Sequence, residues 1–183
     1  MNSEDKNMLD TGMAMSWLKW LGTWALMDFG LAMTMLALVF ILFHIMVRIR
    51  YVSFYEIVYR WIALFALGFT CLYAAYMHVA YPDIAAAAIG WATSPFQFEV
   101  GMADLAIGLL GVFSFRASYG FRLATVIASM VFMWGDAVGH LNQMMINNNF
   151  TPGNAGSWFW LDLLIPLVLI FCIAKMKTRE QYA

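Results

Sequence analysis

The chain has 183 residues, of which 63% are hydrophobic, 17% are aromatic and only 11% are charged. Soluble domains carry about 25% charged residues, so this composition excludes a soluble fold and indicates an integral membrane protein. The net charge is −1 and no basic run alternates with aromatic residues, which excludes nucleic acid as a partner. The two cysteines, Cys71 and Cys172, lie in apolar segments without the spacing of a zinc or haem site, and we expect them to be packing residues.

The first part of the chain is polar and then aromatic. Residues 1–12 contain acidic residues and no signal-peptide pattern, so we expect an uncleaved surface tail. Residues 13–22 carry two tryptophans around a lysine, a composition typical of the lipid headgroup region. The apolar run from Trp24 to Val47 is long enough to cross a bilayer at about 1.5 Å per residue.

Four further spans follow, delimited by turn or cap signals. Ser94 before Pro95, with Gln97 three residues after it, predicts a helix start with Ser94 as N-cap and Gln97 completing a capping box. Residues 83–90 are Ala-rich but too short to span, and predict a short interfacial or re-entrant helix. The expected spans are Trp61–Ala80, Pro95–Phe115, Thr125–Asn147 and Ser157–Ala174, with Pro166 kinking the last.

The sequence therefore predicts an all-α integral membrane bundle of five transmembrane helices. Placing the segments 48–60, 116–122 and 175–183 in the cytoplasm collects eight of the ten Lys and Arg residues there, as cytoplasmic loops favour. The N-terminus is then outside and the C-terminus cytoplasmic. The expected organisation is an extracytoplasmic tail and interfacial lead-in at 1–23, a five-helix domain at 24–174 and a cytoplasmic tail at 175–183.

Two of the predicted spans carry special faces. In the fourth span, six polar residues fall within about 60° of one helical face, which indicates a face turned to the interior of the bundle. Gly135 and Gly139 lie beside this stripe and predict the close approach of a neighbouring helix. The third span has a small-residue face with one carboxylate, at Gly101, Asp104, Gly108 and Gly111. The polar stripe comprises Thr125, Ser129, Asp136, His140, Gln143 and Asn147.

The acidic residues of the spans mark a candidate pocket that opens outward. A carboxylate at the centre of a span costs about 2.5–3.5 kcal/mol, so several of them need a shared compensation: protons, a bound cation or a hydrated cavity. Asp136 and His140, at i and i+4, could together bind a divalent metal ion; hydrogen bonding between helices is the structural alternative. Glu99 lies about 140° around its helix from Asp104, and would cap the outer mouth or face another neighbour. The candidate residues are Asp104, Asp136, His140, Gln143, Asp162, Glu99 and His78.

Four sequence runs resemble a family of small bacterial and archaeal membrane proteins without an assigned activity. They are SPFQFEVG at 94–101, GDAVGH at 135–140, NNNFTPGNAG at 147–156 and DLLIP at 162–166. The resemblance covers about 80–160 and implies the place of a site but no reaction. Glu99, the following glycines and Arg116 are also similar to a pattern of DoxX-like membrane proteins, which implies a quinone-linked redox role. The chain departs from those proteins by an extra span and by the 147–156 loop.

These features favour a small multi-pass protein of a bacterial or archaeal cytoplasmic membrane that binds or passes a proton, a cation or a small polar ligand. The first alternative is a non-catalytic accessory subunit of a larger membrane complex, and the second is a component acting with quinone. The sequence contains no motif that pairs a nucleophile with a general base and no nucleotide-binding loop, so no motif indicates an enzyme. The expected partners are the lipid bilayer and either a larger complex or further copies of the chain, and the candidate cofactors are a divalent metal ion and, less favoured, quinone.

Overall fold

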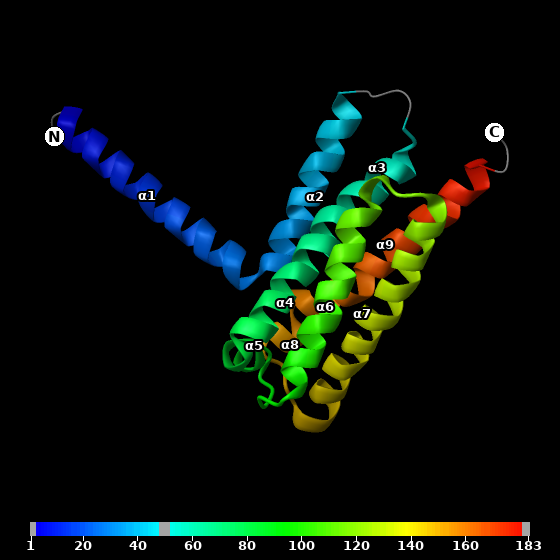
Figure 1. Ribbon diagram of the computed structural model, residues 1–183. Helices are drawn as coiled ribbons and strands as arrows, with labels where there is room; N and C mark the ends of the chain where they lie inside the picture. Colours follow the sequence, from blue (N-terminus) through cyan, green and yellow to red (C-terminus); the bar gives the residue numbers. More distant parts are fainter. Residues whose placement is uncertain (1–2, 48–51, 181–183) are drawn as a thin grey trace.

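A computed structural model describes residues 3–47 and 52–180, and every regular element within these residues is a helix (Figure 1). Arg48 and Arg50 of the predicted cytoplasmic linker lie outside the described residues, as do residues 1–2 and 181–183 of the two predicted tails. Five helical segments are long and apolar enough to cross a membrane, which confirms the predicted number of spans. They are Phe29–Met46, Phe54–Ala80, Phe96–Arg116, Tyr119–Asn147 and Pro152–Met176.

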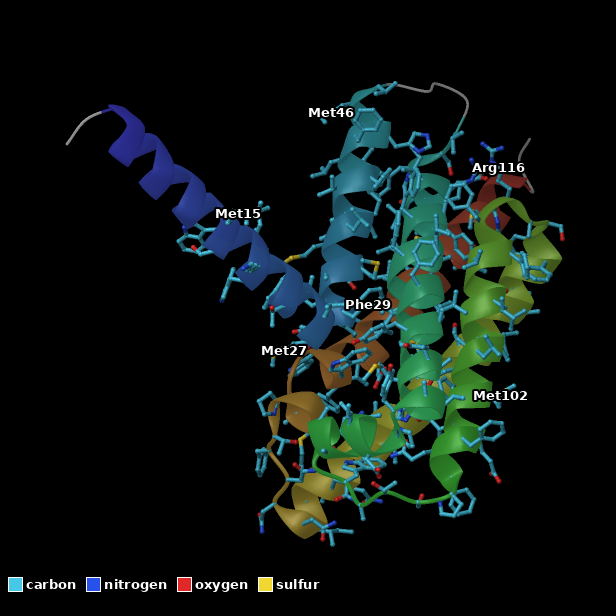
Figure 2. The ribbon with its side chains drawn as sticks, turned by 60° about the vertical axis from the view of Figure 1, so that its left-hand side comes forward. Met15, Met27, Phe29, Met46, Met102 and Arg116 are labelled. Atoms are coloured by element: carbon cyan, nitrogen blue, oxygen red, sulfur yellow. The ribbon has the colours of Figure 1, made fainter. Side chains whose placement is uncertain are left out.

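The N-terminal region is more helical than the sequence predicts, and the first span begins later. Helix α1 runs over Ser3–Met27 and points away from the bundle, whereas α2, Phe29–Met46, lies against it (Figures 1 and 2). Asp28 separates them because its backbone is not helical and its carboxylate accepts a hydrogen bond from the Leu31 amide. The Ser157 hydroxyl also donates to Asp28 Oδ1 over 2.7 Å. The predicted start of the span at Trp24 is therefore wrong: Trp24 belongs to α1.

The second span is a continuous rod of three helical segments. It consists of α3, Phe54–Trp61, the π-helical segment η1, Ile62–Phe69, and α4, Thr70–Ala80. Ser53 caps its start by accepting from the Glu56 amide, so the rod begins before the predicted Trp61. The short helix predicted over residues 83–90 is confirmed as α5, Pro82–Ile89, which ends at Gly90 in the left-handed conformation with φ of 70°.

The third span is α6, Phe96–Phe113, extended by a 3₁₀ turn, η2, over Ser114–Arg116. Its predicted cap is wrong, because the N-cap position falls on Pro95 and has no side-chain hydrogen bond. The side chain of Gln97 instead bonds to Nδ1 of His78, on α4. The small-residue face is confirmed, since a Cβ placed on Gly108 or Gly111 would lie within 3.0 Å of the backbone of the second span.

The last two spans are α7, Tyr119–Asn147, and α9, Ser157–Glu180, joined by the one-turn helix α8, Pro152–Ala155. The polar stripe of α7 faces the interior at Thr125, Ser129 and His140, which are buried, whereas Asn147 at its end is exposed. The close helix contact predicted beside it is wrong for Gly135, because a Cβ there would meet nothing within 4 Å. Gly139 would meet only the ring of Trp91.

Antiparallel packing of the five spans gives the bundle two polar ends. The asparagine end carries α5, the loop with Asn149 and the helix α8 with Asn154, whereas the arginine end carries α3, η2 and the start of α7 (Figure 1). Figure 2 marks the arginine end by Met46 and Arg116. Between the ends lies one apolar core that includes both free cysteines, in agreement with the packing role predicted for them.

Candidate functional site

Three carboxyl groups from three different helices converge in the half of the bundle nearer the asparagine end. Asp104 on α6, Asp136 on α7 and Asp162 on α9 are close enough for their charges to interact. Asp104 is 6% exposed, and the Asp162 side chain is 14% exposed. Cys71, on α4, places its thiol beside the Asp104 carboxyl. We call Asp104, Asp136 and Asp162 the acid cluster.

His140 joins the acid cluster through α9 rather than through its own helix. Its Nε2 lies 3.8 Å from Oδ2 of Asp162, a separation that permits an ion pair but exceeds ordinary hydrogen-bond length. The metal pair suggested by the sequence is Asp136 with His140, but the carboxylate in contact with the imidazole is that of Asp162. Within residues 3–47 and 52–180, no group of three or more His, Cys, Asp or Glu side chains is arranged to hold a metal ion.

The other ring nitrogen of His140 bonds to a residue that sequence reasoning missed. Asn154 of α8 is fully buried, and its Oδ1 lies 2.9 Å from Nδ1 of His140. The same oxygen accepts a hydrogen bond from the Trp91 indole over 2.8 Å. The Asn154 amide nitrogen donates to the carbonyl oxygens of His140 and Asn149. The Trp91 ring also packs on the imidazole, with 5.6 Å between the ring centroids.

The loop between α7 and α9 is held in place by hydrogen bonds to the end of α5. The Asn149 amide nitrogen donates to the Ile89 carbonyl over 2.8 Å, and the Thr151 hydroxyl donates to the same oxygen over 3.1 Å. Gly153 packs against the Ala88 carbonyl, where a side chain would clash. The run of asparagines in an otherwise apolar chain was the available signal, because buried amides need internal partners.

The remaining candidate residues lie outside the acid cluster. Glu99 is exposed at the start of α6. Gln143 lies near the end of α7 and accepts from the Asn147 amide over 2.7 Å. His78 bonds to Gln97 across the interface of α4 and α6. The structure therefore groups His140 with the acid cluster, leaves Glu99 exposed, and assigns Gln143 and His78 to other contacts.

A second polar cluster lies at the arginine end. Arg122, which the sequence places in a basic turn, is only 6% exposed and contacts Glu56 of α3 over 3.2 Å. Its guanidinium also donates to the carbonyls of Ser114 and Phe115, over 3.1 and 3.0 Å. Arg60 shares the same Glu56 carboxylate. These contacts tie α3, η2 and α7 together.

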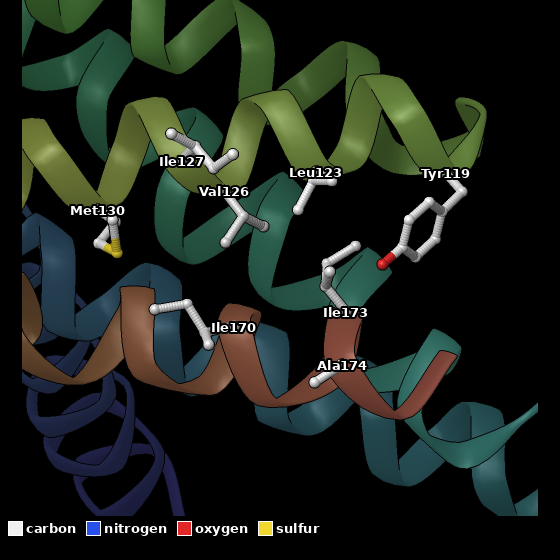
Figure 3. A pocket seen from close by; sticks show the side chains of 8 residues that line it. All are labelled: Tyr119, Leu123, Val126, Ile127, Met130, Ile170, Ile173 and Ala174. Carbon is white, nitrogen blue, oxygen red and sulfur yellow. The ribbon is translucent and has the colours of Figure 1, made fainter. Parts of the chain in front are cut away.

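An apolar groove of about 340 Å³ runs between α7 and α9, away from the acid cluster (Figure 3). It lies nearer the arginine end, and its single polar side chain is that of Tyr119 at one extremity. The lining residues are Tyr119, Leu123, Val126, Ile127, Met130, Ile170, Ile173 and Ala174. The groove faces the side of the bundle where lipid is expected, so it adds no polar chemistry to the candidate site.

Five apolar spans around a buried acid cluster define a multi-pass, all-helical membrane protein. Residues 27–182 match the family of unknown function DUF6790, and the chain belongs to that family. The match agrees with the expectation of a family without an assigned activity. No curated protein and no solved structure matches the chain.

Proposed function

We propose that this protein binds a proton or a small cation at the acid cluster, reached from the asparagine end of the bundle. The observation that carries the proposal is the convergence of Asp104, Asp136 and Asp162 with His140 inside the spans. Each carboxylate at the centre of a span costs about 2.5–3.5 kcal/mol, so three whose charges interact need neutralisation or a counterion. A proton would neutralise a carboxylate, and a small cation would serve as its counterion.

The cationic side chains of the bundle lie elsewhere. Among the described residues, the ion pairs formed by arginine are Arg60 with Glu56 and Arg122 with Glu56, both at the arginine end. His140 is the basic side chain that contacts the acid cluster. It is neutral or charged within the physiological pH range, unlike Lys or Arg, so its positive charge is conditional. The charge balance of the cluster therefore depends on what it binds.

The proposed orientation places the arginine end in the cytoplasm, because the basic residues of the chain collect there. Counting about 1.5 Å per residue from the asparagine end, His140 and Asp162 lie roughly 8–11 Å deep, and Asp104 and Asp136 roughly 12–17 Å deep. A ligand would then enter from outside the cell. It would meet the pair of His140 and Asp162 before the two deeper carboxyls.

The first test compares Asp136→Asn with wild type in lipid nanodiscs. If Asp136 belongs to a binding site, its replacement by a neutral isostere keeps or raises the melting temperature while cation or proton binding falls. The probes are Na⁺, Mg²⁺ and Zn²⁺ by calorimetric titration, and proton uptake between about pH 5 and 8, where an unperturbed histidine titrates. Glu99→Gln is the matched control, because it removes an exposed carboxyl outside the cluster and should leave binding unchanged.

A purely structural acid gives the opposite pattern. If Asp136 serves only to accept hydrogen bonds as an anion, Asp136→Asn destabilises the fold by about 1–3 kcal/mol. Wild type would then bind none of the cations, and its proton uptake would equal that of the variant. That outcome rejects the proposal and favours the accessory-subunit role, for which co-purification with larger partners from native membranes is the direct observation.

A further inference from the structure

We infer that Asn154 is a positioning residue that holds His140 as its Nδ1–H tautomer, so that Nε2, facing Asp162, is the atom that takes up and releases a proton. This inference rests on the proposed function, because it names the ligand of the acid cluster as a proton and the entry point as the pair of His140 and Asp162. It does not follow from the position of His140 in the sequence. It follows from the hydrogen bonds around one buried amide.

The orientation of the Asn154 amide is determined by its four partners. The Trp91 indole nitrogen is only a donor, so the atom 2.8 Å from it must be the amide oxygen. The carbonyls of His140 and Asn149 are only acceptors, so the atom 3.1 and 2.9 Å from them must be the amide nitrogen. Rotating the amide by 180° would place donor against donor and acceptor against acceptor. The observed orientation satisfies both N–H groups and the oxygen in a site without solvent exposure.

The amide orientation then decides which ring nitrogen of His140 carries the proton. Nδ1 lies 2.9 Å from Oδ1 of Asn154, an atom that can only accept, so Nδ1 must donate. A neutral imidazole has one N–H, and with that proton on Nδ1 the lone pair is on Nε2. Nε2 is the atom 3.8 Å from the Asp162 carboxylate. The exchangeable position of His140 is thereby directed at the acid cluster.

The transfer step conserves protons and charge. The Oδ2–H bond of a protonated Asp162 breaks, the Nε2–H bond of His140 forms, and a neutral pair becomes a carboxylate beside an imidazolium. The gap of 3.8 Å is about 1 Å longer than a hydrogen bond, so the step requires a small side-chain rotation that brings the two atoms together. The titratable groups that interact with Asp162 from the other helices are Asp136 on α7, Asp104 on α6 and the Cys71 thiol on α4. α8 contributes no charged group, only Asn154.

An amide is suited to this role because it fixes a tautomer without adding charge. A carboxylate at the same position would also accept from Nδ1, but it would add a fourth carboxyl group beside the acid cluster. Asn154 is itself held in place by its bond to the Asn149 carbonyl, and Asn149 is bonded to the end of α5. The 147–156 loop therefore controls the geometry of the imidazole.

The test is the ¹⁵N spectrum of ring-labelled histidine in the full chain, in nanodiscs. The chain has three histidines, and the His140 signal is assigned by its loss in His140→Ala. In wild type at a pH where His140 is neutral, we expect Nδ1 to be the protonated nitrogen. In Asn154→Leu the acceptor is lost, and we expect Nε2–H to become the main tautomer; Asn154→Asp keeps an acceptor oxygen and should retain Nδ1–H.

Trp91→Phe is the matched control, because it removes a neighbour of Asn154 without removing the bond to His140. It should keep the wild-type tautomer even if the melting temperature falls. The inference is overturned if wild-type His140 is the Nε2–H tautomer, a result that needs no variant to fold. It is also overturned if folded Asn154→Leu keeps Nδ1–H. Either result leaves the cation and proton titrations of Asp136→Asn unaffected, so failure of the inference and failure of the proposed function are told apart.

Discussion

Replacing Gly111 by alanine should loosen the contact between the second and third spans. A Cβ at this position would lie 2.8 Å from the Ala63 carbonyl oxygen and 2.9 Å from both the nitrogen and the Cα of Gly68. All three atoms are backbone, so they cannot rotate away. Ordinary contact begins at 3.4 Å, so α6 must move outward by about 0.5 Å. A gap of that size forfeits about a quarter of the attraction between the atoms that it separates.

The expected loss of stability can be separated from helix propensity by a control. Overpacking of this kind costs about 1–3 kcal/mol, whereas alanine gains about 0.5–1 kcal/mol over glycine within a helix. Gly135→Ala gains the same propensity, but its Cβ meets nothing within 4 Å. The difference in unfolding free energy between Gly111→Ala and Gly135→Ala should therefore be about 1–3 kcal/mol. Propensity cancels in that difference.

The assay is unfolding in detergent micelles, followed by helical circular dichroism, for both variants and wild type. Gly111→Ala should melt below wild type, and Gly135→Ala at or above it. Equal stability of the two variants would show that η1 yields to the added methyl group at no cost, or that α6 does not lie as close to it as the structure indicates. The close-packed glycine face would then be discarded as a source of stability.

Two further predictions concern the arginine end and the orientation of the chain. Arg122→Met should destabilise the bundle by about 3 kcal/mol, because it leaves the carbonyls of Ser114 and Phe115 without their guanidinium donor and leaves Glu56 with Arg60 alone. Exposed Arg116→Met is the control, and equal melting of the two variants would contradict the role given to the cluster. A cysteine at Phe150, which is 67% exposed, should react in intact cells with a membrane-impermeant maleimide, because the basic residues place the asparagine end outside. The two native cysteines are buried and should stay unlabelled; labelling only in opened cells would reverse the orientation.

Several features of the fold were predictable because they depend on local sequence alone. The length of each apolar run determines whether it can span a bilayer, so the number of spans was predicted correctly. The buried face of α7 was readable from helical periodicity, as the burial of Thr125 and Ser129 confirms. The glycines that line the contact of α6 with the second span were also visible as a small-residue face.

Other features depended on residues distant in the chain. Asp28 ends α1 and caps α2 while accepting from Ser157, a partner 129 positions away. Gln97 has the spacing of a capping residue, but its amide bonds to His78 on another helix. Gly135 has the spacing of a helix-contact residue, yet a Cβ there would meet nothing within 4 Å. In each case the outcome depended on whether packing brought a distant part of the chain beside the residue, which local spacing does not specify.

The sequence by itself determined that the chain crosses a membrane and which of its residues are costly to place there. Both depend on the transfer free energy of each side chain, which is a property of the residue. Only the tertiary structure decided which of these polar residues contact one another: His140 contacts Asp162 rather than Asp136, and Asn154 bonds to the imidazole. A hydrogen bond requires two groups to meet at about 3 Å with a set direction, and helix periodicity gives the direction of only one of them.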